Sequence, residues 1–203
     1  LKPDINFTLP GYKIYRHDRT TDIGGGVASI LKTKLKHKDV PDLKLHIIEA
    51  KAIDLQTDLG PLRVVSIYRN LNAETAKMAL DFEKDLIKLS SFKGNFIIVG
   101  DFNAKHKTWN CKYDNKNGRI LKELQSNGHF AIISPDKPTH FSNNGVGSFI
   151  DLVLTNVPEL VINSVTIEEL QSDHFPTITS LNLTKFHSPD SSRFNYKKAD
   201  WPK

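Results

Sequence analysis

Cysteine, methionine and long hydrophobic runs are all scarce in this sequence of 203 residues. The single cysteine, Cys111, excludes an internal disulfide and a cysteine-built zinc site, and it fits a reducing compartment. No apolar run approaches the roughly 20 residues that a membrane-spanning helix needs. There is no internal repeat, low-complexity tract or long linker. We therefore expect one domain, with no membrane among its partners.

The composition that is present fits a globular protein with a basic surface. Hydrophobic residues make up 38% and charged residues 25% of the chain, a balance typical of a folded domain. The net charge is +5 and the isoelectric point is about 9.2. Such a surface favours a polyanionic partner such as nucleic acid, although many enzymes with neutral substrates are equally basic.

The hydrophobic pattern predicts many strands and few helices. Residues 75–89 and 119–126 carry apolar residues at helical spacing, the first behind a possible cap at Asn72. Apolar, β-rich runs bounded by turn formers predict eight strands, at residues 27–31, 45–53, 62–68, 96–99, 131–133, 150–154, 161–167 and 177–183. This pattern indicates an α/β fold in which two sheets pack face to face with helices outside.

The first chemical motif follows the predicted strand 96–99. Gly100-Asp101-Phe102-Asn103 brings a carboxylate and an amide close together at the end of a buried strand. Rigid strand ends are common supports for catalytic groups. The alternative is an Asx-type turn that simply ends the strand.

The second motif is a lone acid in an apolar strand. Asp151 lies within Ile150–Leu154, where burial of an unpaired carboxylate costs at least several kcal/mol. The acid therefore needs a cation, an imidazolium or several hydrogen bonds. A purely structural salt bridge would also meet that need.

The third motif is Ser172-Asp173-His174, just before the strand predicted at residues 177–183. A turn here would let the carboxylate hold a metal while the imidazole faces a phosphate. The alternative is a capped loop with a solvated histidine. Taken together, the three motifs offer hard oxygen ligands that favour Mg²⁺, with Mn²⁺ also possible. They also offer what phosphodiester hydrolysis requires, namely charge neutralisation, an activated water and a donor to the phosphate.

In their order, these three motifs resemble the endonuclease/exonuclease/phosphatase superfamily, and the match covers essentially the whole chain. Within it, the chain looks most like the endonuclease domain of jockey-like non-LTR retrotransposons. The segments behind this are Gly11-Tyr12, Tyr15-Arg16, Asp18-Arg19, Gly24–Val27, Ser66–Arg69, Asp101–His106 with Trp109, and Lys137–Phe141. The resemblance implies a DNase I-like, four-layer α/β/β/α sandwich.

The resemblance also implies a role for each site residue. Asp101 would position or deprotonate the attacking water, and Asn103 would orient the same phosphate. His174 would contact the phosphate, Asp151 would orient His174, Asp173 would bind the metal, and Tyr68 would contact the phosphate. A packed strand-end aromatic is the alternative for Tyr68.

In the family, the main metal-binding glutamate and a first-strand asparagine lie upstream of the position that matches Leu1. We therefore expect an N-terminally truncated domain over residues 1–187, followed at 188–203 by the start of a linker to a reverse transcriptase. The implied activity is nicking of DNA to leave a 3′-hydroxyl primer for reverse transcription, in the nucleus after import from the cytoplasm. Two alternatives are a catalytically impaired nucleic-acid-binding remnant and a phosphoesterase of the same fold acting on an inositol phosphate or sphingolipid.

Overall fold

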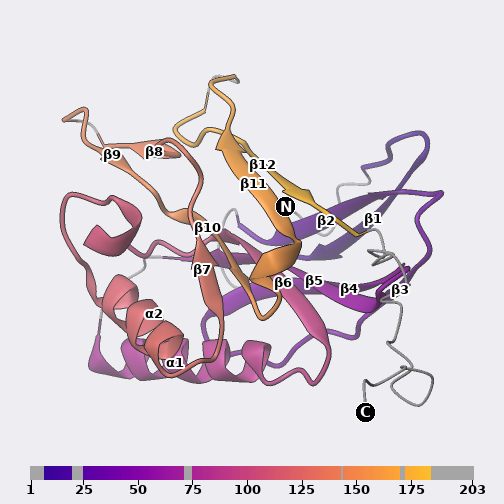
Figure 1. The fold of residues 1–203 in the computed structure, drawn as a ribbon, viewed down its shortest axis with the longest axis horizontal. Coiled ribbons are helices and arrows are strands. Elements are labelled where there is room, and N and C mark those ends of the chain that lie inside the picture. Colours follow the sequence, from indigo (N-terminus) through magenta and orange to yellow (C-terminus); the bar gives the residue numbers. More distant parts are fainter. Residues whose placement is uncertain (1–6, 20–24, 71–74, 143, 170–171, 184–203) are drawn as a thin grey trace, which may run out of the picture.

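The computed structural model describes residues 7–19, 25–70, 75–142, 144–169 and 172–183. A six-stranded mixed sheet lies at its centre, in the order β3-β4-β5-β6-β10-β7 (Figure 1). Its strands are β3 (His37–Asp39), β4 (Ile48–Thr57), β5 (Gly60–Arg69), β6 (Asn95–Asp101), β7 (Ala131–Ile133) and β10 (Asp151–Thr155). The smaller elements are β1 (Tyr12–His17), β2 (Val27–Lys32), β8 (His140–Phe141), β9 (Gly147–Ser148), β11 (Val161–Thr166), β12 (Thr177–Leu181) and the short 3-10 turns η1 (Lys107–Trp109) and η2 (Pro158–Leu160).

Two helices, α1 (Ala76–Ser90) and α2 (Lys116–Ser126), cover one face of the sheet (Figure 1). Phe82, Leu86 and Leu89 of α1 recur at helical spacing and are buried against apolar residues of β4, β5, β6 and β10. The Thr75 hydroxyl accepts a hydrogen bond from the Met78 N–H at 3.2 Å, so Thr75 caps α1. The cap expected at Asn72 falls outside the described residues. Helix α1 joins β5 to β6, the one parallel pair in the sheet.

Strand alternation sends neighbouring residues to opposite faces. In β5, Val65 and Ile67 join the core beneath the helices, whereas Leu62 and Val64 pack in a second cluster on the other face. That second face is covered by two hairpins. The β1–β2 hairpin lies over β4 and β5, where Ser29 and Ser66 share a hydrogen bond of 2.9 Å. The β11–β12 hairpin contributes Leu181 to the second cluster.

All eight predicted strands are present, and both predicted helices are confirmed with ends shifted by a few residues. The predicted two-layer arrangement of strands is also confirmed, although the second layer consists, over the described ranges, of two separate two-stranded sheets. Strands β1, β3, β8 and β9 were not predicted. The last three have only two or three residues, too few for a periodic signal. None of the helices in the described residues is long and apolar enough to cross a membrane.

Candidate active site

Three predicted site residues occupy one cross-strand row at one end of the central sheet. Tyr68 of β5 pairs in register with Asp101 of β6, and Asp101 pairs with Asp151 of β10. Residues at equivalent register on neighbouring strands point to the same face. By alternation with the core residues, this is the face opposite the helices. The structure therefore brings an aromatic side chain and two carboxylates together at one edge of that face.

The turn after β6 is held in an unusual backbone conformation. At Gly100 φ is 142°, and a Cβ atom there would lie 2.0 Å from the Ile67 carbonyl oxygen, so only glycine lets β6 approach β5 this closely. Asn103 adopts a left-handed φ of 46°, which asparagine tolerates better than most residues. Gly100 and Asn103 thus set the path of the chain on both sides of Asp101.

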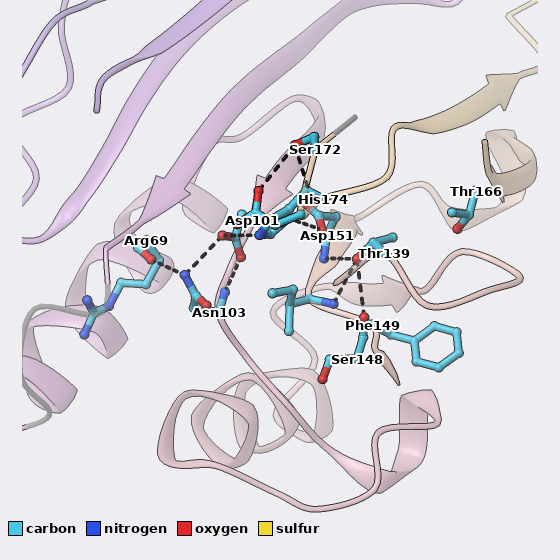
Figure 2. A network of polar contacts seen from close by, with 12 residues as sticks. Arg69, Asp101, Asn103, Thr139, Ser148, Phe149, Asp151, Thr166, Ser172 and His174 are labelled. Carbon is cyan, nitrogen blue, oxygen red and sulfur yellow. Dashed lines mark hydrogen bonds and ion pairs between the residues drawn. The ribbon is translucent and has the colours of Figure 1, made fainter. Parts of the chain in front are cut away.

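Asn103 clamps the Asp101 carboxylate. Its backbone N–H donates to Asp101 Oδ1 at 2.8 Å, and its side-chain Nδ2 donates to Asp101 Oδ2 at 3.1 Å and to the Arg69 carbonyl at 2.8 Å (Figure 2). The Asn103 carbonyl in turn accepts a 2.8 Å hydrogen bond from the side chain of Asn115, the N-cap of α2. The predicted Asx-type turn is therefore present, and it also orients the carboxylate.

Asp151 and His174 form the predicted carboxylate–imidazole pair. His174 Nδ1 lies 3.0 Å from Asp151 Oδ2, and His174 Nε2 lies 3.9 Å from Asp101 Oδ2 (Figure 2). The hydrogen bond to Asp151 raises the pKa of His174. An Nδ1–H that donates to Asp151 leaves Nε2 directed towards Asp101 and the open side of the site.

Thr139 joins the Asp151 strand to the His174 loop, a link that the sequence did not reveal. This fully buried residue accepts a 2.7 Å hydrogen bond at its carbonyl from the Phe175 N–H. Its hydroxyl lies 3.4 Å from the backbone nitrogens of Ile150 and Asp151 (Figure 2). The neighbouring His140 forms an antiparallel bridge with His174. Thr139 thereby holds both members of the pair in place.

The site concentrates negative charge. Burial, followed by the nearby charge of Asp151, raises the pKa of Asp101 to about 7. A carboxyl group with such a pKa is suited to proton transfer near neutral pH. Asp173 is exposed and accepts a 3.3 Å hydrogen bond from the Ser172 hydroxyl. The charges of Asp151 and Asp173 both act on Asp101, and carboxylate oxygens are the ligands that Mg²⁺ prefers.

Glu49 and Arg19 extend the row beyond the predicted residues. Glu49 of β4 pairs in register with Tyr68, and its carboxylate binds the Arg19 guanidinium and accepts a 2.7 Å hydrogen bond from the Gly26 N–H. Arg19 also lies 5.7 Å from the centre of the Tyr68 ring. Tyr68 is therefore flanked by an ion pair on one side and by Asp101 on the other. Only the strand register could have revealed this.

Trp109 and His106, which follow the Asp101 motif, have structural roles. Trp109 is buried, and its Nε1–H donates to the Ala104 carbonyl at 3.2 Å. His106 caps the η1 turn by accepting from the Thr108 N–H. Packing and capping thus account for this pair. The triple glycine at residues 24–26 begins outside the described residues.

A family model described as "Endonuclease-reverse transcriptase" matches residues 62–178, more than half of the chain. The chain belongs to this family. The matched segment contains all six residues that were predicted for the site. The linker expected at residues 188–203 lies outside the described residues.

Two curated relatives of this endonuclease–reverse transcriptase family are RNA-directed DNA polymerases from the mobile element jockey. The chain is 29% identical to the Drosophila funebris protein over 197 residues, which cover 95% of this chain and 21% of the relative. It is also 29% identical to the Drosophila melanogaster protein over 198 residues, with the same coverage. The chain thus spans about a fifth of the length of these relatives.

Solved structures share the fold. The endonuclease domain of TRAS1, a telomere-specific non-LTR retrotransposon, matches with a TM-score of 0.68 and 20% identity, over 86% of this chain and 80% of that one. The Xenopus laevis APE2 catalytic domain matches with a TM-score of 0.62 and 14% identity, over 86% and 76%. These comparisons confirm the resemblance to the endonuclease/exonuclease/phosphatase superfamily and the DNase I-like fold class.

Proposed function

We propose that this domain is a Mg²⁺-dependent endonuclease that nicks DNA and leaves a 3′-hydroxyl end as a primer for reverse transcription. The observation that carries the proposal is the convergence of Asp101, Asn103, Asp151 and His174 at one edge of the sheet. A buried base and an oriented imidazole on one open surface are the groups that phosphodiester hydrolysis uses.

Each residue has a chemical role that its contacts support. Asp101, with a pKa of about 7, would accept the proton of the attacking water. The Asn103 Nδ2 donates to Asp101 and to Arg69, so its Oδ1 stays available to the substrate side. The hydrogen bond to Asp151 raises the pKa of His174 and so favours its protonated form, which would donate an N–H to a phosphate oxygen.

The metal would be bound through oxygen ligands, with Asp173 as the assigned ligand from this chain. When bound, a divalent ion neutralises the negative charge that develops on the phosphoryl oxygens. After burial, the charges of Asp151 and Asp173 also raise the pKa of Asp101, and this concentration of carboxylates supports cation binding here. Mn²⁺ satisfies the same oxygen ligands as Mg²⁺.

DNA is the proposed substrate because the chain carries a net charge of +5 and its curated relatives are polymerases of mobile elements. In the whole protein, the domain would be covalently linked to a reverse transcriptase. Nicking of chromosomal DNA would place its action in the nucleus. The ordered contacts around Asp101 and His174 favour an active enzyme over a binding remnant.

Plasmid nicking tests the proposal. Supercoiled DNA is incubated with the 203-residue chain, and with an N-terminally extended form that carries the glutamate expected upstream of Leu1, in Mg²⁺ or in EDTA. We expect the N-terminally extended form to nick DNA in Mg²⁺ but not in EDTA. A DNA polymerase should be able to add nucleotides directly to the 3′ end of each nick. Asp101→Asn should abolish nicking. Asp58→Asn, an exposed change in the turn at the opposite end of β5, should not.

Three results would contradict the proposal or a part of it. Equal nicking by the Asp101→Asn and Asp58→Asn variants would exclude Asp101 as the base. Nicks that no polymerase extends would exclude a free 3′-hydroxyl product. Full activity of the 203-residue chain would show that the upstream glutamate is dispensable, and would overturn the assignment of the metal ligands.

A further inference from the structure

A second histidine lies beside the site and has no part in the proposed reaction. The His140 ring centre is 4.9 Å from that of His174, and the two ring planes are tilted by 55°. One potential ligand atom from each of His140, Asp173 and His174 lies within 4.8 Å of the others. Among the described residues, these three form the one such group of metal-ligating side chains.

The backbone holds this group together before any ligand arrives. His140 and His174 form an antiparallel bridge, and the Phe175 N–H donates to the Thr139 carbonyl at 2.7 Å. Each histidine is thus next to a residue that takes part in the same backbone link. Two imidazoles on linked backbones lose little freedom when they bind a common ion.

Each ring keeps a nitrogen atom that can bind an ion. His174 uses Nδ1 for Asp151 at 3.0 Å, and a carboxylate on one ring nitrogen is the usual support of a metal-binding histidine. His140 Nδ1 is a buried nitrogen without a hydrogen-bond partner among the described residues. Buried polar atoms of this kind are uncommon and call for an explanation. An ion bound to the ring would provide one.

We propose that His140, Asp173 and His174 form a binding site for a divalent transition-metal ion, and that Zn²⁺ is the ion that it binds most tightly. Two imidazoles and one carboxylate are a ligand set for Zn²⁺ with an open position for water. Mg²⁺ prefers oxygen ligands in near-octahedral geometry, so it gains little from the two rings. Nitrogen ligands also favour Zn²⁺ over Mn²⁺ in the general order of metal affinities.

The spacing fits such an ion after a small adjustment. Ligand bonds of roughly 2.0–2.2 Å around tetrahedral zinc imply ligand-to-ligand distances of roughly 3.5 Å. The widest separation here is at most 4.8 Å. Asp173 is exposed, and its side-chain hydrogen bond within the described part of the chain is to the Ser172 hydroxyl at 3.3 Å, so its carboxylate can move the remaining distance.

Occupancy by Zn²⁺ would compete with the proposed nuclease reaction. The Zn²⁺ ion would bind the His174 nitrogen that faces Asp101. It would also bind Asp173, which would then no longer be free to bind Mg²⁺. Micromolar Zn²⁺ should therefore inhibit Mg²⁺-supported nicking. This consequence rests on the proposed function, whereas Zn²⁺ binding itself does not.

Binding is tested with untagged protein and Co²⁺, whose visible absorption reports its ligands, followed by displacement with Zn²⁺. We expect one tight Co²⁺ per chain. His140→Asn should weaken binding about tenfold or more, since even residues outside the first ligand shell change affinity by 10- to 100-fold. The control is His129→Asn, a half-buried histidine at the far end of β7, which should bind Co²⁺ as the unchanged chain does.

The outcomes are distinguishable. Circular dichroism checks that the His140→Asn variant is folded. If it is not, Asp173→Asn removes another ligand of the site at an exposed position and serves as the test instead. Absence of Co²⁺ absorption, or equal affinity in the His140→Asn, Asp173→Asn and His129→Asn variants, would overturn the site. If Co²⁺ binds as expected but the N-terminally extended form does not nick DNA in Mg²⁺, the proposed function fails and the metal site stands.

Discussion

Removal of the Asp85 carboxylate should be among the most destabilising single changes outside the active site. Asp85 lies on α1 with no exposed surface, and it accepts hydrogen bonds from the backbone N–H groups of His46, Ile47 and Ile48 at 2.8–3.1 Å. His46 Nδ1 lies 2.8 Å from the same carboxylate. The Asp85 carboxylate therefore accepts the hydrogen bonds of the backbone N–H groups at the start of β4, and it links that strand to helix α1.

The expected loss of stability in Asp85→Ala depends on which of these N–H donors could form a hydrogen bond with water instead. His46 is exposed, so its N–H can be hydrated after Asp85→Ala, whereas Ile47 is half-buried and Ile48 is buried. A buried donor left without an acceptor costs about 1–3 kcal/mol. Two such donors, the N–H groups of Ile47 and Ile48, predict a loss of about 2–6 kcal/mol from the free energy of unfolding. That is a large part of the roughly 5–15 kcal/mol that stabilises a domain.

Urea unfolding measures this loss as a fall in the midpoint at constant slope. The matched control is Asp81→Ala, which removes the same charge from the same helix at a position without a side-chain hydrogen bond or ion pair among the described residues. We expect the control to change stability by less than about 1 kcal/mol, as surface changes usually do. Equal shifts of the urea midpoint in the two variants would refute the proposed role of Asp85 as hydrogen-bond acceptor for the start of β4.

Three further predictions concern the site and its support. Asp151→Asn should lower the pKa of His174, because the hydrogen bond to Asp151 is the largest cause of the raised value. NMR titration of the His174 imidazole tests this, and an unchanged pKa would contradict it. Asp101 has a folded pKa of about 7, above that of an unfolded chain, so it favours the folded state below pH 4 and this contribution is lost as the pH rises through 7. Asp101→Asn should therefore raise the melting temperature at pH 8 and have little effect at pH 4. Gly118→Ala should lower it despite better helix propensity, because the new Cβ would lie 1.9 Å from the Lys105 carbonyl oxygen; an unchanged melting temperature would refute that clash.

The sequence predicted what depends on local pattern. The α1 helix follows from apolar residues at helical spacing, and the strand around Asp151 follows from a short apolar run. A lone acid in such a strand indicated that Asp151 needs a partner, and the family resemblance pointed to His174, with which it forms a hydrogen bond. Strand register is a different matter, because it depends on which strands become neighbours. The Glu49–Arg19 pair beside Tyr68 therefore had no local signal.

Register also explains why the site forms on only one face of the sheet. The residues that face the helices in β6 and β10, such as Ile98 and Leu152, are apolar and almost fully buried. On the opposite face, the same two strands place Asp101 and Asp151 directly across from each other. Like charges in such a pair oppose folding, and the Asp151 charge is the second cause, after burial, of the raised pKa of Asp101. The helix-covered face supplies the stability that lets the other face retain two facing carboxylates, an arrangement that an active site can use and a purely structural sheet would avoid.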